Sequence, residues 1–479
     1  MKRREFTRIT GITVAGITLD GIARAQSSSK NDKRPNILFI MTDQQSAHMM
    51  SCTGNRSLHT PAMDRLSTFG TRFEKAYTCN PACVPNRFSL QTGMMPSAVN
   101  LGSNEDSSWA NVTNVTIQQS IGNLFKSVGY DTVYGGKVHL PNRMNHLSSL
   151  GYRILTKDSR QNLADRCARF IKEKHDKPFL LFASFINPHD ICYMAIDDYL
   201  RSIGKSPHDN IGSRNCERIL ERARNNSRLD FINKHCPKLP KNHDIPDKEP
   251  ECIADKYLKL RPFRAYVRNN WGEEQWRLHR WAYCRLTEMV DAKIEILLNA
   301  LHEAGLENNT LVVFTSDHGD MDAAHKLEHK SVLYEEAVRI PFIMSYRGVI
   351  PEGVVNNTHL LSNGLDLLPT LCDYAGIKIL GRLFGASVRP LVEGKPVSNW
   401  RDYIVVESQF GRMLRTSRYK YCIYNSGEYC QQLIDLKNDP MEMRNLAYDK
   451  GTKEILYKHH QLLKNWSEKS GDRIGSKYM

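Results

Sequence analysis

Cys83 stands at the start of a short segment, Cys83 to Gly93, whose residue types could do chemistry together. Pro85 suits the first turn of a helix because its missing N–H is not needed there, and Gly93 suits the position after a helix end. In such a helix Cys83 lies at the positive N-terminus, and Arg87 follows one turn later on the same face. The segment therefore predicts an activated sulfur group beside an anion site, with a buried structural cysteine beside a surface arginine as the plainer alternative.

Two aspartates come directly after apolar runs that are typical of buried strands. Asp43 and Asp317 each follow such a run and a Thr or Ser residue, and His318 comes next to Asp317. Two carboxylates that meet at neighbouring strand ends need a cation between them, or one of them must stay protonated. Oxygen ligands favour a hard divalent ion such as calcium or magnesium, and His318 can add a nitrogen ligand. For Asp43 alone, a helix cap is the alternative.

Lysines and histidines that could handle an oxyanion occur in similar places. Lys137 and His139 follow the pair Gly135-Gly136, where a tight turn can direct both side chains inward. A lysine ammonium group suits a charged oxygen, and a histidine can protonate or hydrogen-bond a departing alkoxide. Any one of these residues by itself would be interpreted as a solvated surface side chain.

Helical and strand patterns alternate along most of the chain, which predicts how these residues are positioned. Apolar runs of strand type occur at 37–41, 131–134, 179–186, 311–314 and 340–346. Between them lie amphipathic helical patterns at 60–69, 116–128, 163–171, 273–304 and 366–375. This alternation predicts an α/β fold with a mostly parallel sheet flanked by helices, in which ligands bind at the carboxyl ends of the strands.

The last hundred residues follow a different pattern. Short strand patterns occur at 403–407, 413–424 and 432–436, and one more helical pattern at 455–466. They predict a small C-terminal antiparallel sheet with a closing helix.

The composition excludes some classes of protein. The chain has 479 residues, of which 41% are hydrophobic and 25% charged, as in soluble globular proteins, and no apolar run is long enough to span a membrane. A net charge of +14 without any nucleic-acid-binding motif favours an acidic polysaccharide over nucleic acid as a partner. The twelve cysteines form no CxxC pair, which predicts mostly buried thiols.

The first 25 residues have the pattern of an export signal. Lys2-Arg3-Arg4 precedes a weakly apolar run, which Ala23-Arg24-Ala25 closes. The paired arginines resemble a twin-arginine signal, and they predict an exported protein, periplasmic or secreted. A basic disordered tail is the alternative.

The segment 83–93 also resembles a specific signature. Cys-x-Pro-x-Arg followed by Leu-x-Thr-Gly is similar to the signature of the type I sulfatases, in the alkaline phosphatase superfamily. The family has serine in many members where this chain has Asn86, but Cys83, Pro85 and Arg87 are all kept. The resemblance implies that Cys83 is oxidised to formylglycine, whose hydrate is the nucleophile. It also implies a maturation partner, either a formylglycine-generating enzyme or an anaerobic sulfatase-maturing enzyme.

Other positions match the family in the same order along the chain. The resemblance implies that the catalytic residues are Cys83, Arg87, Lys137, His139, His189 and Lys330. It places His325 and Gln44 on the substrate side and implies metal ligands at Asp43, Cys83, Asp317 and His318. The implied ion is Ca²⁺, with Mg²⁺ or Mn²⁺ as alternatives, because Gln44 replaces a second aspartate of the family and leaves one negative charge fewer.

Together these patterns predict an exported sulfatase acting on a sulfated carbohydrate. The expected organisation is a signal peptide (1–25), a catalytic α/β domain (34–376) with an insertion at about 195–272, and a C-terminal subdomain (377–479). Two other functions stay open. One is a phosphonate or phosphodiester hydrolase of the same superfamily, which Gln44 and His318 favour, and the other is a non-catalytic protein that binds sulfated glycans.

Overall fold

A computed structural model describes residues 34–224, 228–379, 381 and 383–478 of the chain. Residues 34–479 form one compact unit. The predicted export signal at 1–25 lies outside the described residues, and the predicted domain division at residue 376 stays a prediction. Within the described ranges, no helix combines the length and the apolar character needed to cross a membrane.

The centre of the fold is an eight-stranded, mostly parallel sheet, as the sequence predicts. Its strands lie in the order β5–β4–β6–β1–β7–β8–β2–β9. The first five are parallel to one another: β5 (Arg153–Thr156), β4 (Asp131–Gly136), β6 (Phe179–Pro188), β1 (Asn36–Asp43) and β7 (Thr310–Ser316). Beyond β7 lie β8 (Phe342–Ser345), which is antiparallel to it, then β2 (Thr71–Phe73) and β9 (Val354–Asn356).

Strand β1 lies in the middle of this sheet, as expected for a strand with the continuous apolar run at 37–41. All eight of its residues are buried, and it pairs in parallel with β6 on one side and β7 on the other. Thr42 is in register with Ser316 of β7. Asp43 and Asp317 therefore leave adjacent strands at the same sheet edge.

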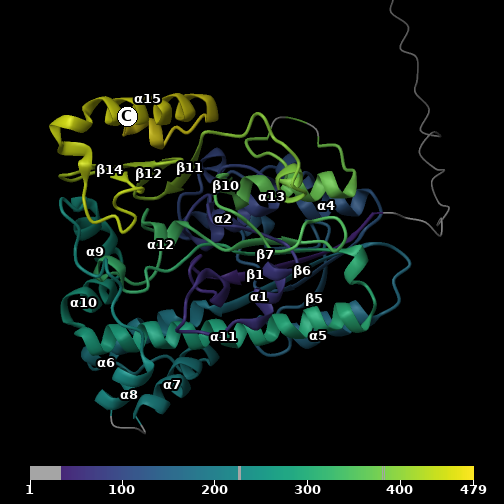
Figure 1. The fold of residues 1–479 in the computed structure, drawn as a ribbon, viewed down its shortest axis with the longest axis horizontal. Coiled ribbons are helices and arrows are strands. Elements are labelled where there is room, and N and C mark those ends of the chain that lie inside the picture. Colours follow the sequence, from purple (N-terminus) through teal and green to yellow (C-terminus); the bar gives the residue numbers. More distant parts are fainter. Residues whose placement is uncertain (1–33, 225–227, 380, 382, 479) are drawn as a thin grey trace, which may run out of the picture. The chain divides into compact units, whose positions relative to one another are not determined.

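Helices cover both faces of the sheet (Figure 1). One face carries α1 (Pro61–Thr68), α5 (Leu163–Lys172) and α11 (Glu273–Glu303). The opposite face carries α2 (Cys83–Thr92), α4 (Ile121–Ser127) and α13 (Asn363–Ala375). The pattern at 116–128 predicts one helix, but the structure has two, α3 (Asn114–Gln118) and α4. Helix α3 ends at Gln118, and the N–H of Gln119 donates to the carbonyl of Val115. Ser120 then has an extended backbone, which separates α3 from α4.

The region 195–272 consists of short helices joined by irregular chain, in agreement with its polar composition. These helices are α6 (Cys192–Ser202), α7 (Ile211–Arg224), α8 (Arg228–His235), α9 (Leu258–Leu260) and α10 (Pro262–Asn270). Figure 1 shows α6, α7 and α8 gathered beside one end of α11.

The C-terminal part has its own antiparallel sheet, β11 (Tyr403–Ser408), β12 (Gly411–Thr416), β13 (Tyr419–Tyr424) and β14 (Gln431–Asp435). Helix α15 (Lys453–Ser470) packs on this sheet through Leu463, which is fully buried. The predicted strand at 413–424 is therefore a hairpin of two strands. Two short strands, β3 (Ala76–Tyr77) and β10 (Leu361–Ser362), form a further parallel pair, and α12 (Glu335–Val338) and α14 (Arg389–Val392) are single turns.

All twelve cysteines lie among the described residues as free thiols, and ten of them are buried. This confirms the prediction of buried thiols.

Candidate active site

Cys83 is the first residue of α2, which confirms the helix predicted from its sequence. The preceding Ala82 is extended, and Gly93 ends the helix with φ 67°, in the left-handed region that glycine adopts without strain. All ten side chains of α2 are buried, and the helix packs against α13. The start of α2 is thus a fixed, water-poor place for a reactive group.

Cations surround the Cys83 sulfur. Its Sγ lies 3.2 Å from Lys330 Nζ and 3.7 Å from Lys137 Nζ. Burial by itself raises the pKa of the Cys83 thiol, but the two ammonium groups outweigh it and hold that pKa well below its usual range. An anionic group is therefore stabilised at this position, as the sequence predicts.

Arg87 is a buried residue that holds other side chains in place, because its guanidinium group donates hydrogen bonds to buried partners. It is 2% exposed, donates through Nε to Asp317 Oδ2 (2.8 Å) and through one terminal nitrogen to Asp43 Oδ2 (2.8 Å). The other terminal nitrogen donates to Ser184 Oγ (2.9 Å) and to the carbonyl of Lys137 (3.0 Å). Arg87 thus holds the two carboxylates side by side.

The two carboxylates differ in how readily they give up a proton. Burial raises the pKa of Asp43, but Lys137, whose Nζ lies 2.6 Å from Asp43 Oδ2, leads the cations that hold it well below its usual range. Burial and the nearby Asp43 charge raise the pKa of Asp317. Arg87 alone therefore does not offset both charges fully, and a further cation would favour the ionised form of both.

Lys137 reaches this pair because of the residue before it. Gly136 has φ 94°, and a Cβ on it would lie 2.0 Å from the carbonyl oxygen of Ser184, so only glycine fits. Two residues later, His139 is exposed with φ 47° and makes no hydrogen bond with any described residue. The structure brings Lys137 to Cys83 and leaves His139 on the surface.

Two more histidines lie at the site. His318 donates from Nδ1 to the carbonyl of Gly319 (2.9 Å), since that oxygen can only accept, and its Nε2 lies 3.2 Å from Cys83 Sγ. His189 follows β6; its Nε2 lies 4.0 Å from Asp43 Oδ1, and its buried Nδ1 has no partner among the described residues. Burial, reinforced by nearby lysines, lowers the pKa of His189.

The side chain of Gln44 contacts Lys330, and only its backbone N–H contacts the carboxylate pair. Its Oε1 accepts from Lys330 Nζ (2.8 Å), and its Nε2 donates to Asp320 Oδ2 (2.6 Å) and to Cys192 Sγ (3.1 Å). Its backbone N–H donates to Asp317 Oδ1 (3.1 Å). Gln44 therefore orients the Lys330 ammonium group toward Cys83.

Several residues of this cluster were missed by sequence reasoning. Asn86 ties the Cys83 helix to the turn after β7, because its amide donates to the carbonyl of Asp317 (2.6 Å) and accepts from the N–H of Cys79 (3.0 Å). Asp320, whose pKa burial raises to about 6, anchors Gln44, and Ser184 anchors Arg87. Asp320 could have been found, since it lies three residues after Asp317 in the same polar run.

The structure does not bring His325 to this cluster. Its side chain is fully buried and stacks on Tyr334, with ring centroids 4.1 Å apart. It lies instead beside two acidic residues, Glu336 and Glu442.

The donor atoms beside Cys83 fit a divalent metal ion. One ligand atom from each of Asp43, Cys83, Asp317 and His318 lies within 4.8 Å of the others, and all four side chains are buried. Two carboxylates and one imidazole, with one carboxyl whose pKa is raised, are suited to hold such an ion. The Cys83 sulfur marks the position from which a modified residue 83 would present its oxygens.

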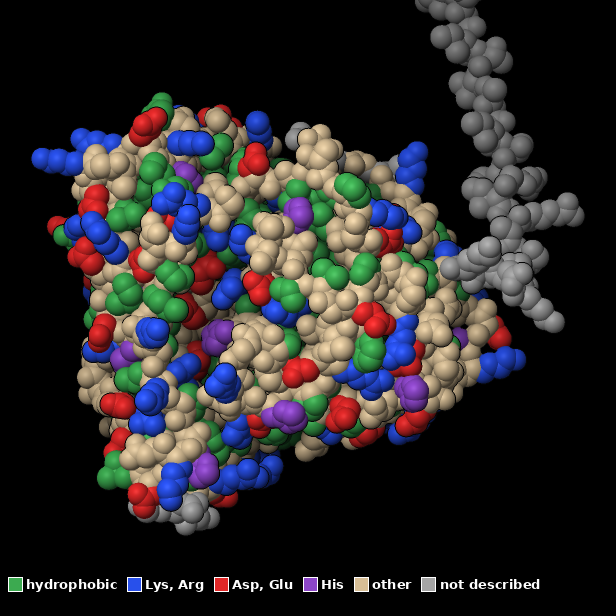
Figure 2. Space-filling model, viewed as in Figure 1, with side chains coloured by type: hydrophobic (Ala, Val, Ile, Leu, Met, Phe, Trp, Pro, Cys, Tyr) green, Lys and Arg blue, Asp and Glu red, His purple; other side chains and the backbone are tan. Residues whose placement is uncertain are grey.

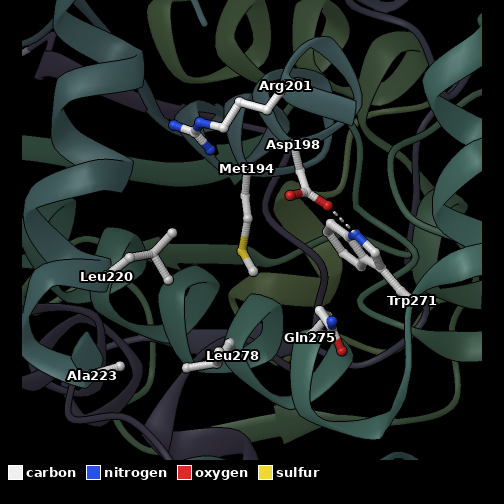
Figure 3. Close-up of a pocket in the computed structure, with 8 residues that line it drawn as sticks. All are labelled: Met194, Asp198, Arg201, Leu220, Ala223, Trp271, Gln275 and Leu278. Atoms are coloured by element: carbon white, nitrogen blue, oxygen red, sulfur yellow. Dashed lines mark hydrogen bonds between the residues drawn. The ribbon is translucent and has the colours of Figure 1, made fainter. Parts of the chain in front are cut away.

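A separate cavity of about 160 Å³ lies among α6, α7, α10 and α11 (Figure 3). In it Trp271 Nε1 donates to Asp198 Oδ2 (2.7 Å). None of the described residues that line it belongs to the Cys83 cluster.

Known proteins resemble this chain over nearly its whole length. A family model described as Sulfatase matches residues 35–377, and one described as N-sulphoglucosamine sulphohydrolase, C-terminal, matches residues 323–469. The Delta 4,5-hexuronate-2-O-sulfatase of Bacteroides thetaiotaomicron is 29% identical over an alignment of 478 positions, gaps included, which covers 94% of this chain and 92% of that relative.

Solved structures show the same similarity. A 2-O GAG sulfatase is 27% identical with a TM-score of 0.75, and the match covers 92% of this chain and 93% of that one. A phosphonate monoester hydrolase of Agrobacterium radiobacter has a TM-score of 0.71 over 91% of this chain and 96% of its own. At 19% identity, the second likeness shows a shared fold alone.

Proposed function

The chain belongs to the sulfatase family and is a sulfuric ester hydrolase, and on this premise we propose that it desulfates a sulfated carbohydrate through a formylglycine made from Cys83. The observation that carries this proposal is the position of Cys83 Sγ, buried at the start of α2 beside Lys330, Lys137 and His318. A hydrated formylglycine there would supply two hydroxyls. One would attack sulfur as the bond to the sugar oxygen breaks, and the other would lose its proton and become the aldehyde carbonyl as sulfate leaves.

The protein's own side chains would prepare that attack. Lys137 and Lys330 place two ammonium groups at the Cys83 position, where they offset negative charge on the sulfuryl oxygens. Arg87 donates to the carboxylates of both Asp43 and Asp317 and keeps them next to each other, so that they can hold a divalent ion together with His318. Such an ion, for which Ca²⁺ is the first candidate and Mg²⁺ or Mn²⁺ are alternatives, would supply positive charge next to those oxygens.

The departing oxygen needs a hydrogen-bond donor, and two histidines can provide one. His189 Nε2 faces the cluster from the end of β6, within 4.0 Å of Asp43 Oδ1. His139 lies on the surface two residues after Lys137, where it could contact a bound sugar. We infer that His189 donates to the leaving oxygen and that His139 contacts the sugar, with His325 outside this set.

The 2-O-sulfatase relative supports a proposal for the substrate class. The 2-O-sulfatase relative acts on a Delta 4,5-hexuronate, and its match covers more than nine-tenths of both chains. We infer a 2-O-sulfated uronic acid as the sugar, in an exported protein that a formylglycine-generating or anaerobic sulfatase-maturing enzyme has modified. Gln44, His318 and a shared fold favour the alternative of a phosphonate hydrolase, whereas the matching family model and the 2-O-sulfatase relative favour a sulfatase. The intact cluster argues against a protein that merely binds glycans.

A direct comparison of two ester classes tests the reaction. We expect 4-nitrophenyl sulfate to be hydrolysed with a kcat/KM about 10³-fold above that of 4-nitrophenyl phenylphosphonate, a difference of about 4 kcal/mol in transition-state stabilisation. An unsaturated disaccharide with a 2-O-sulfated uronate should be desulfated, and its 6-O-sulfated isomer should not. A faster phosphonate reaction would exclude the sulfatase assignment, and a reversed isomer preference would exclude the substrate class alone.

Basic side chains of the region 195–285 are expected to attract the rest of a sulfated chain. Figure 2 shows lysines and arginines, with acidic residues between them, over the part of this face where α6, α7 and α8 lie. Arg264 and Arg268, although basic, are buried, and Arg268 pairs with Glu249, so they cannot contribute. Arg218 is exposed and makes no ion pair with a described residue.

We therefore expect added salt to raise the KM for a sulfated oligosaccharide much more than the KM for an aryl sulfate, because screening weakens attraction beyond roughly 10 Å at 0.1 M salt. Arg218→Glu should reduce this salt effect. Lys469→Glu on α15 makes the same charge change and should leave the salt effect as it is. Equal salt dependence for both substrates would show that these side chains do not bind the glycan.

A further inference from the structure

A second group of potential metal ligands lies on another side of the segment that carries Lys330. It consists of His325, Glu336 and Glu442, and one ligand atom from each lies within 4.8 Å of the others. Glu336 lies in α12, after β7 and its following loop, whereas Glu442 lies in the segment that follows β14. None of the three belongs to the Cys83 cluster.

His325 has two buried ring nitrogens, Nδ1 and Nε2, without hydrogen-bond partners among the described residues, which indicates a ligand-binding position. Its side chain is fully buried. Burial lowers its pKa to about 4, so the imidazole is neutral and both its shape and its lone pair suit a metal ion. A buried imidazole without any partner leaves two polar atoms unsatisfied, which costs free energy unless something binds there.

Glu336 offers an uncompensated negative charge next to this imidazole. Its Oε1 accepts a hydrogen bond from Asn242 Nδ2 (2.8 Å), but its buried Oε2 has no partner. It makes no ion pair with any described residue, in contrast to Glu335 and Glu442 beside it. A cation at Oε2 would both neutralise this carboxylate and satisfy it.

Glu442 completes the group in a different way. Its carboxylate forms an ion pair with buried Lys420, which also donates to the carbonyl of Leu333 (2.8 Å), and its Oε2 accepts from the N–H of Glu335 (2.6 Å). It is thus held firmly, with charge already balanced by Lys420. A metal ion would share this carboxylate with Lys420 and draw its main electrostatic gain from Glu336.

An ion can reach the group from outside. Glu336 and Asn242 line a cavity of about 510 Å³, whose wall also includes Met441, 40% exposed. His325 and Glu442 both have left-handed backbone conformations, with φ 55° and 57°. The three ligand atoms already lie within 4.8 Å of one another, and tetrahedral coordination at ~2.1 Å places ligand atoms ~3.4 Å apart, so binding an ion requires only a small approach.

We propose that His325, Glu336 and Glu442 form a second metal site, one that takes a divalent transition-metal ion of the zinc type. One imidazole nitrogen and two carboxylate oxygens are ligands that zinc-type ions accept, and three protein ligands leave a fourth position for water. At the Cys83 cluster the oxygens of a modified residue 83 would add to the two carboxylates, and such an oxygen-rich set suits calcium. The second site fastens the loop that carries Lys330 to the C-terminal part of the chain. It is independent of the reaction at Cys83.

Zinc titration of chelator-treated protein tests this site, with calorimetry to count the ions bound. In Asp317→Asn, where the Cys83 cluster is weakened, we expect one zinc ion to remain, and the double variant Asp317→Asn/His325→Gln should bind none. Zinc should raise the melting temperature of the first variant and leave that of the second unchanged. Glu336→Gln in the otherwise unaltered chain should lower the zinc stoichiometry by one.

His279 provides a matched control. It is also fully buried, and burial lowers its pKa to about 4. Among the residues that the structure describes, neither ring nitrogen has a hydrogen-bond partner and no pair of carboxylates forms a ligand group with it. His279→Gln should therefore keep the full zinc stoichiometry. If the double variant binds as much zinc as Asp317→Asn alone, or if His279→Gln loses zinc as His325→Gln does, the proposed site does not exist.

Discussion

Cys83→Ala is expected to abolish sulfate-ester hydrolysis while leaving the fold intact. Residue 83 is placed to attack from the start of α2, beside Lys330 and Lys137. An alanine there has no oxygen or sulfur that could form a bond with the sulfur of the substrate. Loss of an enzyme's nucleophile typically lowers kcat by about 10⁴ to 10⁶-fold. The small, buried change should cost only about 1 kcal/mol of stability. Steady-state assays with an aryl sulfate, together with circular dichroism, would measure both effects.

Cys167→Ala is the matched control for this substitution. Cys167 is likewise fully buried, on α5, and burial raises the pKa of its thiol to about 12. We expect full activity for this variant. Mass spectrometry of the active protein should find an aldehyde at residue 83 and an unmodified thiol at residue 167. An active Cys83→Ala enzyme would refute the mechanism.

Asp317→Asn is expected to remove one bound metal ion and nearly all activity together. The substitution keeps the shape of the side chain but takes one of the two carboxylate charges from the ion, and it leaves Arg87 Nε without its charged partner. One remaining carboxylate and one imidazole hold a divalent ion poorly. We expect the metal affinity and kcat/KM each to fall by at least about 10²-fold, the upper range seen even for residues that only support a ligand.

Metal content by mass spectrometry separates this effect from general damage. Asp291→Asn serves as the control, since Asp291 is also buried but accepts hydrogen bonds from the N–H groups of Ala62 and Met63 at the start of α1. It should lose some stability and keep its metal. Addition of calcium, magnesium or manganese to the chelated enzyme identifies the ion. Unchanged metal content in Asp317→Asn would show that this carboxylate is not a ligand.

Local patterns in the sequence were enough to predict the elements that carry the cluster. The buried strands β1 and β7, the helix that begins at Cys83 and the strand that precedes Lys137 all have apolar runs or end signals within a dozen residues. The same local rules failed for β2 and β9, because strands of three residues show no period. They also merged β12 and β13, since the turn between these two strands is short.

The sequence by itself determined which residue types stand at the strand ends and at the start of α2, because each depends on neighbours along the chain. Only the tertiary structure decided which of them meet. The strand order places β6 and β7 on either side of β1, and that order brings Arg87 between Asp43 and Asp317 and Gln44 to Lys330. The tertiary structure also places the side chain of His325 away from the Cys83 cluster, although Lys330 of that cluster follows it by only five residues. Left-handed residues lie in that loop, His329 and Ser331 among them, and they turn side chains in directions that neither helical nor strand periodicity describes.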